Sequence, residues 1–150
     1  MEGKFGAVIV AAGSSRRMGG QGSKVLEDLG GQPVLLYSFR TLASSPWVGE
    51  LAVVCREEDR PQVEALLAGK TDKPWAVVPG GQERQDSVLA GVACLGPDTP
   101  YLLIHDGARP FVTAEQVDAL CQDAVAYGAA TLAVPSKDTC KLSDGQALWN

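Results

Sequence analysis

Short apolar runs rich in β-branched residues recur along the chain and predict the strands of a sheet. They occupy residues 7–10, 51–55, 76–78, 102–104 and 131–134. The runs show little alternation of apolar and polar residues, which is typical of parallel strands covered on both faces. Segments with helical periodicity separate them, at residues 34–42, 62–67, 84–95 and 113–127. This alternation predicts an α/β domain with a mainly parallel sheet.

The last predicted helix and the segment after it carry the clearest local signals. Thr113 and Gln116 have the spacing of a capping box, and Gly128 is suited to end the helix. Further on, residues 137–149 surround the turn sequence Ser143-Asp144-Gly145 and predict a polar β-hairpin. The sequence ends within the returning strand of this hairpin, so we expect one domain that is part of a longer protein.

The composition is that of a soluble globular domain. The chain has 150 residues, of which 45% are hydrophobic and 21% charged, and its formal net charge is −5. Proteins that bind nucleic acid through its phosphates usually present a basic surface, so we expect no nucleic-acid partner. The apolar stretch at residues 5–12 is too short to span a bilayer, which predicts a cytoplasmic chain without membrane contact. A small anionic ligand remains compatible with this charge, because it needs only a local basic pocket.

The cysteines give no sign of a metal site. The four cysteines form no C-x-x-C pair, and the chain has one histidine, so a structural zinc site is disfavoured. Cys94 and Cys121 fall on apolar helical positions, and we expect both in the core.

Candidate chemistry lies in three loops that follow predicted strands, where open parallel sheets bind their ligands. The first, residues 11–24, is rich in glycine and contains Arg16, Arg17 and Lys24. Backbone N–H groups and cations of this kind suit a phosphate chain. The loop matches neither the Walker A pattern nor G-x-G-x-x-G. A solvated basic surface loop is the alternative interpretation.

The second and third loops carry polar residues at the same edge of the predicted sheet. Gly80 and Gly81 would let the backbone approach a flat ligand, and Ser87 could donate to a base or ribose; an ordinary turn and an early-helix serine are the alternative. Asp106 could bind a hydroxyl or hold Mg²⁺ directly or through water, or it could simply pair with Arg109. For His105 we favour a strand-end hydrogen bond over catalysis, because phosphoryl transfer does not demand a histidine base.

Four segments in register resemble the 2-C-methyl-D-erythritol 4-phosphate cytidylyltransferase family of the non-mevalonate isoprenoid pathway. They are Ala11-Ala12-Gly13 with Arg16-Arg17-Met18 and Lys24; Gly80-Gly81 with Glu83-Arg84 and Asp86-Ser87-Val88; His105-Asp106-Gly107-Ala108-Arg109-Pro110; and Lys137-Asp138-Thr139. The resemblance implies a Rossmann-like, mainly parallel sheet of the nucleotidyltransferase type. It also implies one domain over residues 1–150, with residues 137–150 the start of a protruding dimerisation β-arm, and a family C-terminal part without counterpart in this sequence.

The same resemblance implies a reaction in which a sugar-alcohol phosphate attacks the α-phosphate of CTP and releases pyrophosphate, assisted by Mg²⁺. Arg17 and Lys24 would stabilise charge in the transition state, as positioning and electrostatics dominate such transfers. Asp106 and Arg109 would line the substrate side, and Thr139 would reach the substrate bound to the other subunit of a homodimer. The residues expected to hold the cytidine are Ala11, Ala12, Gly13, Gly81, Gln82 and Ser87.

The sequence departs from the family pattern at three positions within these motifs. Other functions therefore stay open. Val10 stands where the family has proline, Gln82 where it has an acidic residue, and Gly107 where it has alanine. The nearest alternative is a ribitol 5-phosphate cytidylyltransferase, which shares much of this motif set. A nucleotide-binding module without turnover is an alternative from another class, although Arg17 and Lys24 argue against it. A Rossmann dehydrogenase is disfavoured by the missing third glycine of its fingerprint.

Overall fold

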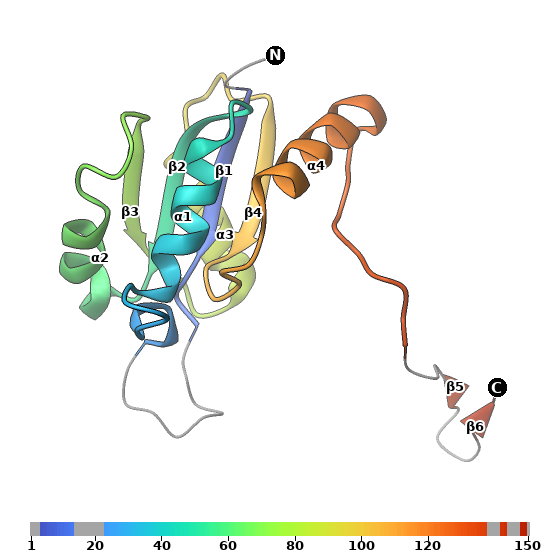
Figure 1. Ribbon diagram of the computed structural model, residues 1–150, viewed down its shortest axis with the longest axis horizontal. Helices are drawn as coiled ribbons and strands as arrows, with labels where there is room; N and C mark the ends of the chain where they lie inside the picture. The colour runs from blue at the N-terminus through green and yellow to red at the C-terminus, as the bar shows by residue number, and fades with distance from the viewer. Residues whose placement is uncertain (1–3, 14–22, 138–141, 144–147, 150) are drawn as a thin grey trace.

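Four of the predicted strands form one parallel sheet in the computed structural model, which describes residues 4–13, 23–137, 142–143 and 148–149. The strands are β1 (Phe5–Val10), β2 (Val48–Cys55), β3 (Trp75–Pro79) and β4 (Tyr101–Asp106). Their spatial order is β3–β2–β1–β4, so β1 is central and pairs with both β2 and β4 (Figure 1). The predicted α/β class and the parallel sheet are confirmed.

Helices cover both faces of this sheet, as the continuous apolar strands predicted. They are α1 (Val34–Ser44), α2 (Arg60–Leu67), α3 (Arg84–Val92) and α4 (Ala114–Tyr127), with the short 3₁₀ turns η2 (Lys24–Leu26) and η3 (Glu57–Asp59). Alternate strand residues point to opposite faces. Phe5, Ala7 and Ile9 of β1 pack with α1, α2 and α4 in the main core, whereas Val8 packs in a smaller cluster with Val92 of α3.

Two expectations are wrong, one about a fifth strand and one about the end of a helix. Residues 131–134 form no strand in the described structure, and Leu132 and Val134 there are 52% and 87% exposed. β-branched composition suits a strand but does not supply the neighbouring strand that a ladder requires. The helix predicted to residue 95 ends at Val92, so Cys94 lies in the following turn and is exposed, whereas Cys121 is buried as expected.

The predicted capping box and helix end of α4 are confirmed, and the predicted hairpin is confirmed in the antiparallel pairing of its described residues, which place Ser143 in a strand and not in the turn. Thr113 accepts a hydrogen bond from the backbone N–H of Gln116, whose side chain completes the capping box. Gly128 ends the helix with φ +89°, a conformation that favours glycine. β5 (Leu142–Ser143) pairs antiparallel with β6 (Leu148–Trp149), and the turn between them lies outside the described residues. None of the described helices is long and apolar enough to cross a bilayer.

The contact between α3 and the sheet depends on Gly91. A Cβ at this position would lie 2.4 Å from Val8 Cγ1 and 2.9 Å from Val54 Cγ2, both buried in the strands below. Because strand side chains cannot retreat into a packed core, only glycine permits this approach.

We therefore expect Gly91→Ala to lower the free energy of unfolding by about 2 kcal/mol, within the range for overpacked cores. Urea unfolding measures this loss. Gly13→Ala is the control, because its Cβ would meet nothing within 4 Å, and it should leave stability unchanged or slightly raised. Equal stability of the Gly91→Ala and unsubstituted proteins would contradict the close approach.

Candidate functional site

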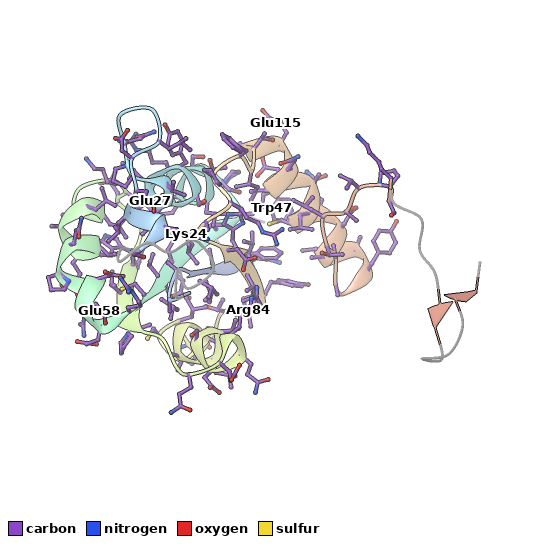
Figure 2. The ribbon with its side chains drawn as sticks, turned by 90° about the horizontal axis from the view of Figure 1, so that it is seen from below. Lys24, Glu27, Trp47, Glu58, Arg84 and Glu115 are labelled. Atoms are coloured by element: carbon purple, nitrogen blue, oxygen red, sulfur yellow. The ribbon has the colours of Figure 1, made fainter. Side chains whose placement is uncertain are left out.

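The carboxyl ends of the strands bring the three candidate loops together. Val10 is in register with Val54 of β2 and with Asp106 of β4. Beyond this level the backbone ladder continues: Ala11 N donates to Val54 O (2.7 Å) and Gly107 N to Val10 O (2.8 Å). Gly80 N likewise donates to Cys55 O at 2.8 Å. The loops therefore begin side by side at one edge, which Figure 2 views from below.

The first loop enters and leaves this edge as predicted. Ala11 is buried, Ala12 is half-buried and Gly13 is exposed. Lys24 opens the short turn η2 at the same end of the sheet and is half-buried, while the next residue, Val25, is buried in the main core (Figure 2). Lys24 is thus held by an anchored backbone. Arg17 lies outside the described residues, as does Thr139 of the arm.

Gly80 allows the first and second loops to touch. A Cβ on Gly80 would lie 2.4 Å from the Cβ of Ala12 and 2.8 Å from Ser87 Oγ. The lack of a side chain at Gly80, which was predicted to admit a flat ligand, therefore serves to pack the two loops against each other. Gln82 follows in this turn and is exposed.

Ser87 fixes the turn between β3 and α3. Its side chain is 3% exposed; Oγ accepts a hydrogen bond from Gly81 N (3.1 Å) and donates to Glu83 O (3.3 Å). The hydroxyl that could serve a base or ribose thus has its proton committed inside the turn. The N–H of Gly81 is also used there, so the polar group that Gly81 offers to a ligand is its carbonyl oxygen.

Two arginines hold the carboxylate of Asp106. Arg109 Nε lies 3.1 Å from Oδ2, which confirms the pair considered from the sequence. Arg84 Nη2 lies 2.8 Å from Oδ1, a partner that the sequence interpretation missed. Arg84 begins α3 directly after the second loop, and that position at the carboxyl edge was the available signal. Two guanidinium groups therefore share one carboxylate at this edge of the sheet.

These ion pairs are exposed and can open for a ligand. The side chains of Arg84 and Arg109 are 63% and 77% exposed, and exposed pairs contribute about 0–1 kcal/mol. A phosphate group could therefore replace the carboxylate as partner of either guanidinium at little cost.

Two carboxylates near this edge are engaged with protein groups. Both oxygens of Asp106 already accept from arginine, and Asp86 Oδ2 accepts from the backbone N–H of Glu83 at 3.0 Å to cap α3. Within residues 4–13 and 23–137, no group of three or more potential ligand side chains gathers around a common point. Mg²⁺ generally keeps its waters and binds to one or two carboxylates together with substrate phosphates.

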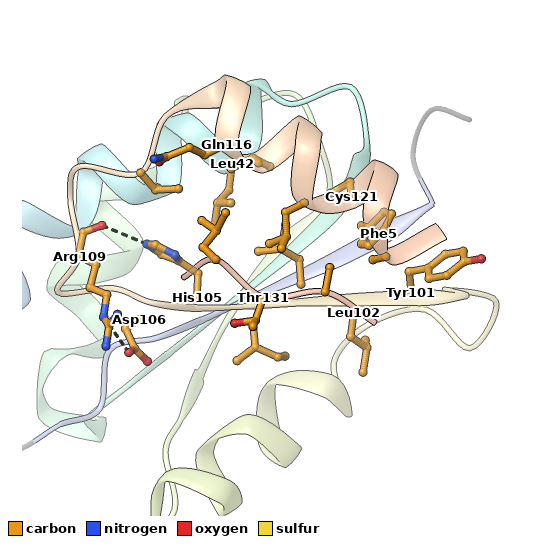
Figure 3. A pocket seen from close by; sticks show the side chains of 18 of the residues that line it. Phe5, Leu42, Tyr101, Leu102, His105, Asp106, Arg109, Gln116, Cys121 and Thr131 are labelled. Atoms are coloured by element: carbon orange, nitrogen blue, oxygen red, sulfur yellow. Dashed lines mark hydrogen bonds and ion pairs between the residues drawn. The ribbon is translucent and has the colours of Figure 1, made fainter. Parts of the chain in front are cut away.

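His105 lies on the opposite face of β4 from Asp106, because strand side chains alternate. Its Nε2 is 3.2 Å from Ser38 Oγ of α1 and 3.1 Å from the carbonyl oxygen of Arg109. Burial lowers the pKa of His105 below its usual value of 6.5, so the imidazole is neutral at pH 7. The predicted strand-end hydrogen bond is confirmed (Figure 3).

A cavity of about 1050 Å³ runs along β4 from this site. Asp106 and Arg109 line its polar end, and Leu103 and Cys121 line its apolar part between β4 and α4 (Figure 3). The charged groups suited to phosphates are therefore confined to the end at the strand termini.

Because Ser87 organises the second loop, we expect Ser87→Ala to cost about 1–3 kcal/mol of unfolding free energy, the usual cost of leaving a buried polar group unpaired. Thermal or urea unfolding measures it. The control is Ser44→Ala, which removes an exposed serine hydroxyl bonded to Thr41 O and should change stability by less than about 0.5 kcal/mol. A Ser87→Ala protein as stable as the control would show that the turn does not need this hydroxyl.

Comparison with known proteins relates these loops to a family. A family model described as 2-C-methyl-D-erythritol 4-phosphate cytidylyltransferase (IspD) matches residues 5–149. A protein of that name from Pelotomaculum thermopropionicum is 42% identical over 142 residues, which are 93% of this chain and 60% of the relative. The bifunctional enzyme IspD/IspF of Desulforudis audaxviator is 46% identical over 138 residues, covering 91% of this chain and 35% of that protein.

Solved structures give the same relationship. The crystal structure of 4-diphosphocytidyl-2C-methyl-D-erythritol synthase from Anaerococcus prevotii matches with a TM-score of 0.80 at 26% identity, covering 97% of this chain and 63% of that chain. A second synthase structure matches with a TM-score of 0.71, also at 26% identity, over 99% of this chain and 66% of that one. The chain thus spans 60–64% of the length of the first curated relatives.

Proposed function

Since the chain belongs to the 2-C-methyl-D-erythritol 4-phosphate cytidylyltransferase family, we propose that its protein transfers CMP from CTP to 2-C-methyl-D-erythritol 4-phosphate and releases pyrophosphate. This reaction belongs to non-mevalonate isoprenoid biosynthesis. The observation that carries the proposal is the edge of the sheet where loops from β1, β3 and β4 begin side by side and where Arg84 and Arg109 share the carboxylate of Asp106.

The nucleotide occupies the side formed by the first two loops. Ala11, Ala12 and Gly13 provide main chain beside the turn at Gly80 and Gly81. The carbonyl of Gly81 is a hydrogen-bond acceptor, and acceptors suit the exocyclic amino group of cytosine. Gln82 lies at the exposed part of this turn, and Ser87 keeps the turn in place from behind.

Lys24 and Arg17 act on the phosphates. As the acceptor phosphate attacks the α-phosphorus, negative charge gathers on the non-bridging oxygens, and cations placed there lower the barrier. Lys24 suits this role because its backbone is anchored next to buried Val25. Mg²⁺ stays part of the proposal, but Asp106 in its observed pairing is not its ligand, and the transfer described here relies on the protein cations.

The acceptor binds at Asp106 and Arg109. A guanidinium group recognises phosphate by paired, charge-assisted hydrogen bonds. Because the ion pair at Asp106 is exposed, Arg109 can leave it and bind the phosphate of the sugar-alcohol substrate. The carboxylate of Asp106 then accepts a hydrogen bond from a hydroxyl of the same substrate. The protein is a homodimer, and Thr139 on the β-arm of the second subunit completes the acceptor side of the site. The enzyme is cytoplasmic.

Product formation tests the reaction. The protein incubated with CTP, Mg²⁺ and 2-C-methyl-D-erythritol 4-phosphate should release pyrophosphate and yield the cytidine diphosphate adduct, detected by ³¹P NMR. ATP, GTP and UTP should react far more slowly. Faster turnover with ribitol 5-phosphate would favour the alternative cytidylyltransferase. CTP binding without pyrophosphate release from either acceptor would favour a nucleotide-binding module.

Replacing either loop cation should affect the chemical step. We expect Lys24→Ala and Arg17→Ala each to lower kcat about a hundredfold, corresponding to about 3 kcal/mol of lost transition-state stabilisation. CTP affinity measured by calorimetry should change much less. Lys70→Ala, on the turn after α2, is the matched control and should be unaffected. Weaker CTP binding with kcat unchanged would show that the cations only hold the nucleotide.

A shared site predicts complementation between two inactive variants. Mixing a Lys24→Ala protein with a Thr139→Ala protein should restore activity, because some heterodimers regain one intact site. Each variant with itself should stay inactive after the same treatment. Heterodimers that form, as shown by mass spectrometry, without any recovered activity would contradict the contribution of Thr139 across the dimer.

A further inference from the structure

The main-chain carbonyl of Arg109 receives two side-chain groups from other elements. Ser38 Oγ of α1 donates to it at 3.1 Å, and Nε2 of His105 of β4 lies 3.1 Å from the same oxygen. Ser38 is fully buried, and its own Oγ lies 3.2 Å from His105 Nε2. The three groups form a closed triangle directly behind the turn at the site.

This triangle determines the protonation of His105. A carbonyl oxygen only accepts, so a bare Nε2 at 3.1 Å would place two acceptors against each other. Nε2 therefore carries the proton, and the neutral ring has its lone pair on Nδ1. Burial, which lowers the pKa of His105 more than nearby Asp106 raises it, agrees with a neutral ring.

The triangle also fixes the turn that carries the site. Arg109 N donates to Asp106 O at 3.0 Å, and Gly107 N donates to Val10 O at 2.8 Å. The peptide groups on either side of Arg109 are thus both held, one by the turn and one by Ser38 and His105. From this backbone the guanidinium of Arg109 reaches the carboxylate of Asp106.

We propose that Ser38 and His105 are positioning residues that aim the Arg109 side chain at the acceptor phosphate by holding the Arg109 carbonyl. The assignment of the ligand as a phosphate rests on the proposed function. Ser38 is fully buried in α1, and Nε2 of His105 is directed to Ser38 and to the Arg109 carbonyl, whereas Asp106 pairs with Arg84 of α3. The hydrogen bonds of the triangle join Ser38, His105 and Arg109, and none of them reaches the loops on the nucleotide side. Substitution of Ser38 or His105 should therefore weaken binding of the acceptor more than binding of CTP.

Kinetics separates positioning from general damage. Ser38→Ala and His105→Phe each remove one donor and should raise KM for the acceptor about tenfold, while CTP affinity measured by calorimetry stays within twofold. His105→Gln, which restores an N–H donor, should recover most of the loss. Ser44→Ala on the same helix is the control. Equal weakening of CTP and acceptor, or no change in the acceptor KM, would overturn the proposal.

NMR tests the geometry independently of turnover. His105 is the single histidine of the chain, so ¹⁵N-histidine labelling gives one imidazole to observe. We expect the Nε2-protonated neutral form at pH 7.5 and a titration midpoint below 6.5, and Ser38→Ala should shift the Nε2 resonance. A Nδ1-protonated ring, or no response to Ser38→Ala, would overturn the anchoring of Arg109. Absence of product from the unsubstituted protein would instead refute the proposed function. The NMR experiment would still show whether Ser38 and His105 hold the Arg109 carbonyl.

Discussion

The register of β1 between β2 and β4 is the constraint on which the candidate site depends. Val10 is level with Val54 and Asp106, and Val54 is level with Val78 of β3, so the loops after β1, β3 and β4 leave the sheet from one line. Each loop then continues the ladder by one further backbone hydrogen bond before it turns away. A shift of one residue in this register would exchange the two faces of a strand and send His105 and Asp106 to the wrong helices.

The alternation along β4 gives neighbouring residues separate duties. His105 faces α1 and is neutral and bonded to backbone, whereas Asp106 faces α3 and is charged and bonded to arginines; both are half-buried. One side of the strand thus holds the turn rigid, and the other offers polar groups that can change partners. Rigid support behind adaptable charges is what precise binding of an anion requires.

Much of the fold could be predicted from the sequence because β1 and most of β2 are buried on both faces and leave continuous apolar runs. The capping box at Thr113 and the helix end at Gly128 could be predicted for a different reason, because each is a local interaction. The errors arose where a local pattern was not enough. Residues 131–134 suit a strand but have no ladder in the described structure, and Cys94 continues a helical pattern past the end of α3.

The candidate site was predicted less completely, because some of its contacts depend on topology. Asp106 with Arg109 could be proposed from their spacing, whereas Arg84 and Ser38 reach the site only after α3 and α1 have docked on the sheet. The role of Ser87 changed for a similar reason: its helical position was clear from the sequence, but its bonds to Gly81 and Glu83 were not. The roles of Arg17 and Thr139 stay predictions.

The central place of β1 also has a consequence for how the polypeptide acquires its structure. β1, which precedes the other strands of this sheet in the chain, pairs on one side with β2 and on the other with β4, whose last residue is Asp106. Parallel pairs of such wide sequence separation give a high contact order, which slows folding. On the ribosome, the inner strand must wait with one edge open until most of this domain has emerged. Until β4 has been made, the apolar β1 keeps an unpaired edge that favours aggregation.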